Sequence, residues 1–144
     1  MARIYKEITI NAPPQKIFSY LTKPSNLPQI WPSVVEIKNE QLLPNGGYSA
    51  EWVYKMAGRH LEGTGEYIDI APNQYFTIKT KGDVDSTITC TIRSMDSQTR
   101  VTLTIDYRVP LALLGWLAGR IIVKMNEQEA QAILANLRAI LEES

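Results

Sequence analysis

The chain has 144 residues, of which 44% are hydrophobic and 21% are charged, and its 15 basic and 15 acidic side chains give a formal net charge of zero. These values predict one globular domain over residues 1–144, and the lack of a basic run excludes an ordinary nucleic-acid binder. With Cys90 as the single cysteine, the chain forms neither an internal disulfide nor a cysteine-based metal site, and a reducing, cytoplasmic setting is expected.

No membrane-spanning or targeting segment is expected. The N-terminal residues carry charges where a secretory signal needs an apolar run. The longest uncharged apolar stretch, Val109 to Gly119, has 11 residues, whereas a spanning helix needs about 20.

The first predicted elements are one strand and two short helices. Isoleucines alternate with polar residues from Ile4 to Ile10, which indicates a half-buried strand. Asn11-Ala-Pro-Pro14 stops that strand, because tandem prolines cannot donate to a ladder. Two short helices follow, separated by Pro24 and closed by Pro32. Since neither is long enough to be stable alone, both must pack on a larger body.

From Val34 onward the sequence has a period of two, which is typical of strands. Turn residues at 44–47, 58–59, 71–74, 81–83 and 96–99 divide this region into six strands. Apolar residues keep to one side of most strands, which predicts an antiparallel sheet with one covered face. Gly63 and Gly65 lie within one strand and allow sharp curvature there.

A long helix is predicted after Pro110, since no proline follows and helix formers are frequent. About 30 residues would span roughly 45 Å, enough to cross the sheet. Most acidic side chains, among them Glu129, are expected off the buried stripe. That stripe consists of Leu114, Leu117, Ile121, Met125, Ala130, Ile133, Leu134, Leu137, Ile140 and Leu141.

The order of these elements resembles the START and birch-pollen-allergen-like superfamily (SRPBCC), which includes polyketide cyclases and lipid-transfer domains. The resemblance covers the whole chain. Its most specific pieces are Ala12-Pro-Pro-Gln-Lys-Ile-Phe-Ser-Tyr-Leu21 and Leu27-Pro-Gln-Ile-Trp-Pro-Ser-Val34. It implies an α+β helix-grip fold, with a seven-stranded curved antiparallel sheet wrapped around the C-terminal helix and enclosing a cavity. The loop at Asn45-Gly-Gly47 is shorter than the glycine-rich loop of the allergen branch, so the subfamily stays open.

The resemblance predicts which side chains line that cavity. The expected wall consists of Trp52, Tyr54, Met56, Tyr67, Tyr75, Ser86, Ile88, Cys90, Tyr107, Leu117 and Ile121. The expected mouth consists of Trp31, Leu114 and Trp116. Alternation alone does not decide which face of a strand looks inward, because one bulge shifts the register. The same aromatic side chains are equally compatible with a solid core.

Catalytic and metal-binding constellations are not evident. His60 is the sole histidine, so histidine metal sites and most catalytic triads lack their partner. The pairs Glu62/Glu66 and Asp83/Asp85 share a strand face, and a solvated edge explains them better than acid–base chemistry. Cys90 is expected to be an inert core residue. We therefore predict no catalytic residue, metal or cofactor.

Three functions remain open. The first is a non-catalytic binder or carrier of a small hydrophobic molecule, such as a lipid, polyketide or isoprenoid. The second is a metal-free enzyme of the cyclase/dehydrase kind that uses the same cavity. The third is an accessory protein whose apolar segment, Leu111–Gly119, touches a membrane surface or a partner. Ligand identity and oligomeric state stay open.

Overall fold

The computed structural model describes residues 2–56, 58–108 and 119–143. In it, seven strands pair into one antiparallel sheet. The strands are β1 (Ala2–Ile10), β2 (Val34–Leu42), β3 (Tyr48–Met56), β4 (Arg59–Ala71), β5 (Tyr75–Gly82), β6 (Ser86–Met95) and β7 (Gln98–Tyr107). Their order is β1-β7-β6-β5-β4-β3-β2, so the later strands form a meander and β1 pairs with its last member. The predicted seven-stranded sheet is confirmed.

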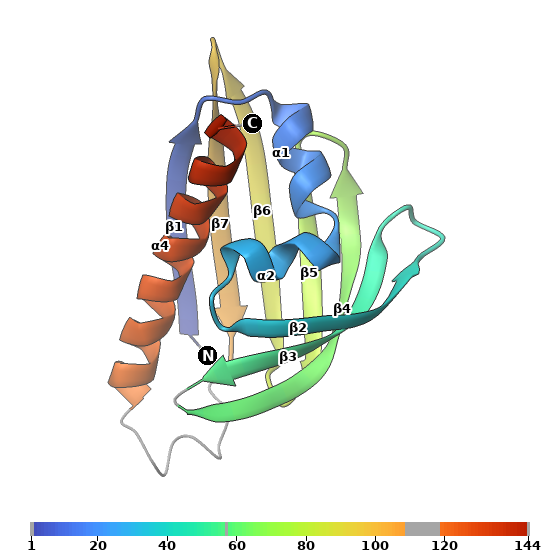
Figure 1. The fold of residues 1–144 in the computed structure, drawn as a ribbon, viewed down its shortest axis with the longest axis vertical. Coiled ribbons are helices and arrows are strands. Elements are labelled where there is room, and N and C mark those ends of the chain that lie inside the picture. The colour runs from blue at the N-terminus through green and yellow to red at the C-terminus, as the bar shows by residue number, and fades with distance from the viewer. Residues whose placement is uncertain (1, 57, 109–118, 144) are drawn as a thin grey trace.

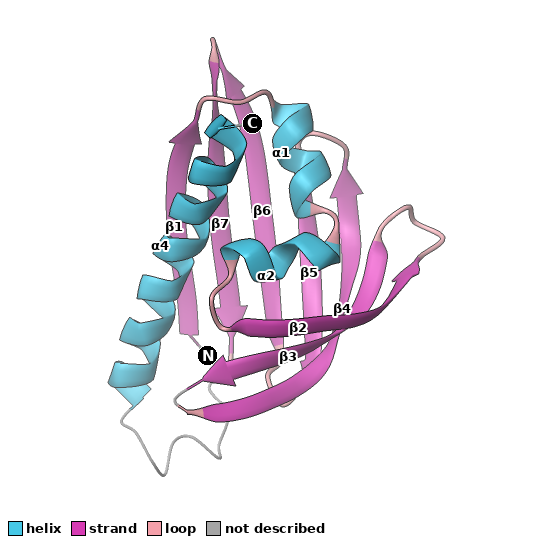
Figure 2. Ribbon diagram, viewed as in Figure 1, coloured by secondary structure: helices cyan, strands magenta, loops and turns pink. Residues whose placement is uncertain are grey.

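The helices lie on one side of this sheet (Figure 1). The short elements that follow β1 are α1 (Pro14–Leu21), the 3₁₀ turn η1 (Pro24–Asn26) and α2 (Leu27–Ile30). The last helix, α4 (Gly119–Glu143), runs along β1, and the β2–β4 part of the sheet curls forward below α2 (Figure 2). This α+β arrangement confirms the helix-grip fold.

The curvature of the sheet has a local cause at Gly63 in β4. A Cβ atom there would collide with the carbonyl oxygen of Lys81 and with the Trp52 ring. Glycine therefore lets β5 approach closely and lets the indole lie across the strand. The register of β4 against β5 also shifts between Tyr67 and Asp69, and such a bulge increases the local twist.

The buried face of α4 differs from the predicted stripe at its N-terminal end. Ile122, Ala130 and Leu137 are fully buried, whereas Ile121 is 50% and Met125 is 40% exposed. Ile121 precedes Ala130 by nine residues, which is about two and a half turns, so the two side chains point to opposite sides. Placing Ile121 and Met125 on the buried stripe was wrong for that reason.

Hydrogen bonds anchor the short helices to α4, as their limited intrinsic stability requires. The Asn136 amide donates to the carbonyl oxygen of Ile30 at 3.0 Å. The Lys16 ammonium donates to the carbonyl oxygen of Leu141 at 2.9 Å, which satisfies one carbonyl in the last turn of α4. The predicted dependence of the two short helices on a larger body has this physical basis.

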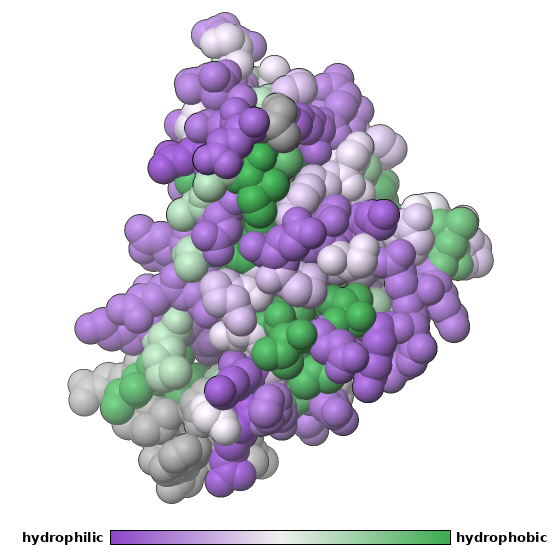
Figure 3. Space-filling view, viewed as in Figure 1, coloured by the Kyte–Doolittle hydropathy of each residue, from purple (hydrophilic) through white to green (hydrophobic). Residues whose placement is uncertain are grey.

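Hydrophilic side chains cover most of the face seen in Figure 3. Apolar ones gather between the C-terminal part of α4 and α1 and over β2 and β3 below α2. Smaller apolar areas lie at the tip of the β2–β3 hairpin, where Leu42 is exposed, and near the start of α4, where Ile121 is exposed. No helix within residues 2–56, 58–108 and 119–143 is long and apolar enough to cross a membrane. The predicted mouth and wall residues Leu114, Trp116 and Leu117 lie outside the described residues, as does most of the Leu111–Gly119 segment.

Candidate functional site

A cavity of about 120 Å³ lies between the concave face of the sheet, the α2 region and α4. A cavity of that volume has room for several water molecules. It is smaller than the roughly 300–1,000 Å³ of sites for drug-sized ligands, so it suits a small ligand. The wall is mostly apolar, because every second residue of each strand points to the concave side.

The structure brings eight of the predicted residues together around this cavity. They are Trp31, Trp52, Tyr54, Met56, Tyr67, Ser86, Ile88 and Tyr107. The inward face of β3 supplies three of them, and β4, β6 and β7 supply four more. Trp31 ends α2 and stands edge-on to Tyr54, with ring centroids 6.2 Å apart. Contact of these residues with a ligand stays a prediction.

Three predicted wall residues lie elsewhere. Tyr75 is 42% exposed on the outer face, because Phe76 and Ile78 take the inward positions of β5. Cys90 faces inward but pairs with Phe76 beneath α1, so it belongs to the solid core. Ile121 points away from the sheet for the helical reason given above.

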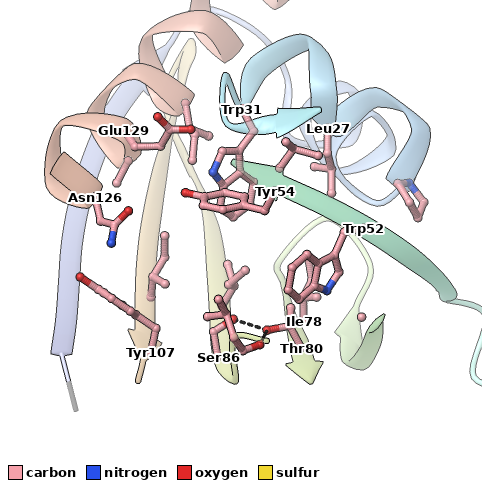
Figure 4. Close-up of a pocket in the computed structure, with 18 of the residues that line it drawn as sticks. Leu27, Trp31, Trp52, Tyr54, Ile78, Thr80, Ser86, Tyr107, Asn126 and Glu129 are labelled. Atoms are coloured by element: carbon pink, nitrogen blue, oxygen red, sulfur yellow. Dashed lines mark hydrogen bonds between the residues drawn. The ribbon is translucent and has the colours of Figure 1, made fainter. Parts of the chain in front are cut away.

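Several lining residues were not foreseen. Asn126 and Glu129 project from α4 onto the wall, although Glu129 was expected off the buried stripe. They are three residues apart and hence on one side of the helix, in line with Ile122 and Ile133. This spacing in the sequence places both polar residues on the inward side of the helix, and a pattern of apolar residues alone does not include them. Leu27, Ile78 and Thr80 complete the part of the wall shown in Figure 4.

Unpartnered polar atoms concentrate at this cavity. Among the described residues, four buried side-chain atoms have no hydrogen-bond partner: Trp31 Nε1, Trp52 Nε1, the Tyr107 hydroxyl and Asn126 Nδ2. All four side chains line the cavity. Folded proteins pair nearly all buried polar atoms, so a cluster of exceptions on one concave wall points to an external partner.

Other polar groups of the wall already have partners inside the protein. The Ser86 and Thr80 hydroxyls bond each other at 2.5 Å, and Thr80 also donates to the Val84 carbonyl oxygen at 3.2 Å. The Tyr67 hydroxyl donates to the carbonyl oxygen of Leu21 at 2.6 Å. These groups hold the wall together and have less capacity left for a ligand.

Burial and one carboxylate set the electrostatics of the cavity. Burial raises the pKa of Tyr54 to about 12, and the negative charge of Glu129 adds to the rise, while polar contacts of Trp31 and Ser33 with the Tyr54 hydroxyl, outside full hydrogen-bond geometry, oppose it. Glu129 Oε1 accepts a hydrogen bond from the Ser33 backbone N–H at 2.7 Å. Burial also raises the pKa of Tyr107, and a polar contact with the neighbouring Asn126 amide, outside full hydrogen-bond geometry, opposes the rise. These phenols are hydrogen-bond donors at neutral pH.

The acidic pairs have structural or solvent-exposed positions. Asp83 accepts from the Glu62 backbone N–H at 2.8 Å, and Asp85 accepts from that of Gly82 at 3.3 Å, so both stabilise the β5–β6 turn. Glu62 and Glu66 are exposed on the outer face of β4, and His60 is exposed as well. Within the described part of the chain, no three His, Cys, Asp or Glu residues converge on a metal-sized site.

Comparison with known proteins identifies the type of fold. The family model described as polyketide cyclase / dehydrase and lipid transport matches residues 1–142. No curated protein matches the sequence.

Solved structures share the architecture over almost the whole chain. A START superfamily protein from Mycobacterium smegmatis has a TM-score of 0.81 at 15% identity, covering 98% of this chain and 97% of its own. An aromatase/cyclase from Streptomyces sp. R1128 has a TM-score of 0.75 at 15% identity, covering 98% and 93%. A protein from Thermus thermophilus has a TM-score of 0.74 at 19% identity, covering 96% and 95%. At these identities the likeness shows the fold alone.

Proposed function

Because the chain belongs to the polyketide cyclase / dehydrase and lipid transport family, we propose that it binds a small, mostly apolar molecule in the cavity between the sheet and α4. The observation that carries this proposal is the cluster of unpartnered polar atoms on an otherwise apolar wall. Ligand sites combine these two features, since apolar burial gives affinity and a few polar atoms fix orientation.

Apolar burial supplies the affinity in this proposal. Each 100 Å² of apolar ligand surface removed from water contributes about 2.5 kcal/mol, before the cost of lost motion. The lining residues Met56, Ile78, Ile88 and Ile105 present such surface to a ligand. The protein then acts as a carrier or receptor, and no group of the cavity has to change the bound molecule.

Fluorescence titration with the neutral apolar dye N-phenyl-1-naphthylamine tests the proposal. Ala50 lies on the wall, so Ala50→Leu places three more carbon atoms in a cavity of about 120 Å³. We expect saturable binding by the wild type and a loss of about tenfold or more in Ala50→Leu. Ala135→Leu makes the same change on the exposed side of α4 and should leave binding unchanged. Equal binding by all three proteins would show that the dye does not use this cavity.

A second candidate is a cyclase/dehydrase-type reaction in the same cavity. One observation favours it: the Glu129 carboxylate shares the wall with the hydroxyls of Tyr54 and Tyr107, as proton transfer requires. Incubation with a soluble β-diketone, followed by mass spectrometry, distinguishes the two candidates. A carrier returns the compound unchanged, whereas an enzyme converts it and loses that activity in Glu129→Gln.

A further inference from the structure

Unpartnered donors gather on the α4 side of the cavity. Tyr107 on β7 and Asn126 on α4 face each other there, and the Trp31 indole lies farther along the wall, beside the Tyr54 ring (Figure 4). Tyr107 is only 4% exposed. An indole N–H and an amide NH₂ only donate, and a phenol hydroxyl donates as well. Tyr107 and Asn126 therefore offer two donors to an acceptor on the ligand, and Trp31 offers a third farther along the wall.

Charge restricts what that acceptor is. Among the described lining residues Glu129 alone carries a formal charge, and none is a Lys or Arg of the kind that pairs with bound carboxylates and phosphates. The charge of Glu129 acts across the cavity, because it adds to the raised pKa of Tyr54. An anionic ligand group beside it would meet a like charge in poorly solvated surroundings.

From this arrangement we infer that the cavity binds apolar molecules with an uncharged carbonyl group in preference to the corresponding carboxylates. This inference rests on the proposed function. A carbonyl oxygen has two lone pairs, so it can accept from Tyr107 and Asn126 at once. The apolar remainder then lies toward Ile78, which is across the cavity from α4 (Figure 4). The ligand satisfies buried donors that the protein leaves unpaired, which makes the preference favourable.

Binding of three matched naphthalenes, measured by competition with the neutral dye, tests this inference. The probes are 1-acetylnaphthalene, 1-ethylnaphthalene, in which a methylene replaces the carbonyl, and 1-naphthoate. We expect wild-type protein to bind the ketone about tenfold or more tightly than the carboxylate. Tyr107→Phe keeps the ring volume and should lower the affinity for the ketone by roughly three- to tenfold, which is the effect of one hydrogen bond. It should not lower the affinity for 1-ethylnaphthalene. Glu129→Gln should raise the affinity for 1-naphthoate by about tenfold, because it removes the like charge.

Tyr75→Phe is the matched control, because it removes the same hydroxyl from the exposed outer face and should change no affinity. Urea denaturation establishes that each variant is folded. The inference would be overturned if Tyr107→Phe changed the affinities for 1-acetylnaphthalene and 1-ethylnaphthalene equally. It would also be overturned if the wild type bound 1-naphthoate more tightly than the ketone. Either result would leave the proposed function standing. Failure of all three probes to bind wild-type protein would instead refute the proposed function.

Discussion

Two tyrosines of the cavity wall should respond differently to the same substitution. Tyr67 and Tyr107 are both almost fully buried, at 2% and 4% exposure. The Tyr67 hydroxyl donates to the Leu21 carbonyl oxygen at 2.6 Å, whereas the Tyr107 hydroxyl has no partner. Removing each hydroxyl by Tyr→Phe changes one atom at a similar depth. The difference between the two variants therefore reports mainly the hydrogen bonding of the two hydroxyls.

Tyr67→Phe leaves a buried carbonyl without a donor, which costs about 1–3 kcal/mol of unfolding free energy. Tyr107→Phe removes a hydroxyl that no protein group accepts and that water in the ligand-free cavity can solvate, so the unfolding free energy of the ligand-free protein should change by less than about 1 kcal/mol. The variants should then differ by about 2 kcal/mol, or about 1 M in the urea midpoint for a domain of this size.

Urea denaturation followed by tryptophan fluorescence and by circular dichroism measures both midpoints on protein freed of ligand by solvent extraction. Coincident transitions establish that the two-state analysis holds. Destabilisation of Tyr107→Phe by as much as Tyr67→Phe would show that the Tyr107 hydroxyl is paired inside the protein. The reasoning about unpartnered donors would then fail.

Four further substitutions test the packing and the electrostatics. Gly63→Ala should destabilise the protein by about 2 kcal/mol or more, because the new Cβ would overlap the Lys81 carbonyl oxygen. At Gly65 a new Cβ would meet only side-chain atoms at 3.6 Å or beyond, so Gly65→Ala should be tolerated. Thermal melts compare the two variants. Leu137→Ala should cost about 2–5 kcal/mol in urea denaturation, since the side chain is fully buried under the sheet. Burial raises the pKa of Cys90 from 9.0 to about 12, so the folded thiol stays neutral while the unfolded one ionises. The unfolding free energy of the wild type should therefore fall as the pH rises from 9 to 12. Its slope should be steeper than that of Cys90→Ala by up to about 1.4 kcal/mol per pH unit. Below pH 8 the two proteins should have the same pH dependence. An equal slope in both proteins above pH 9 would contradict that assignment.

The fold followed from local patterns that act over a few residues. Alternation and turn residues place β6 and β7 within a residue or two, because each strand buries one face and a slip would reverse it. Tandem prolines and short apolar runs likewise marked α1 and α2 as helices that need support.

The candidate site was less predictable because it depends on which elements meet. Tyr75 and Cys90 are both on strands, yet one faces solvent and the other lies under α1. Asn126 and Glu129 resemble surface residues in the sequence, and only the packing of α4 turns them toward the cavity. Lack of a hydrogen-bond partner is a property of the assembled wall, so no single-sequence pattern reports it.

The indole N–H signals of the ¹⁵N-labelled protein test the central claim most directly. Trp31 Nε1 and Trp52 Nε1 are buried, without a hydrogen-bond partner in the protein, and on the cavity wall. Titration with 1-acetylnaphthalene, with assignments from Trp→Phe variants, should shift both signals in step with occupancy. Saturable binding that leaves the Trp31 and Trp52 signals unmoved would place the ligand elsewhere and contradict the account.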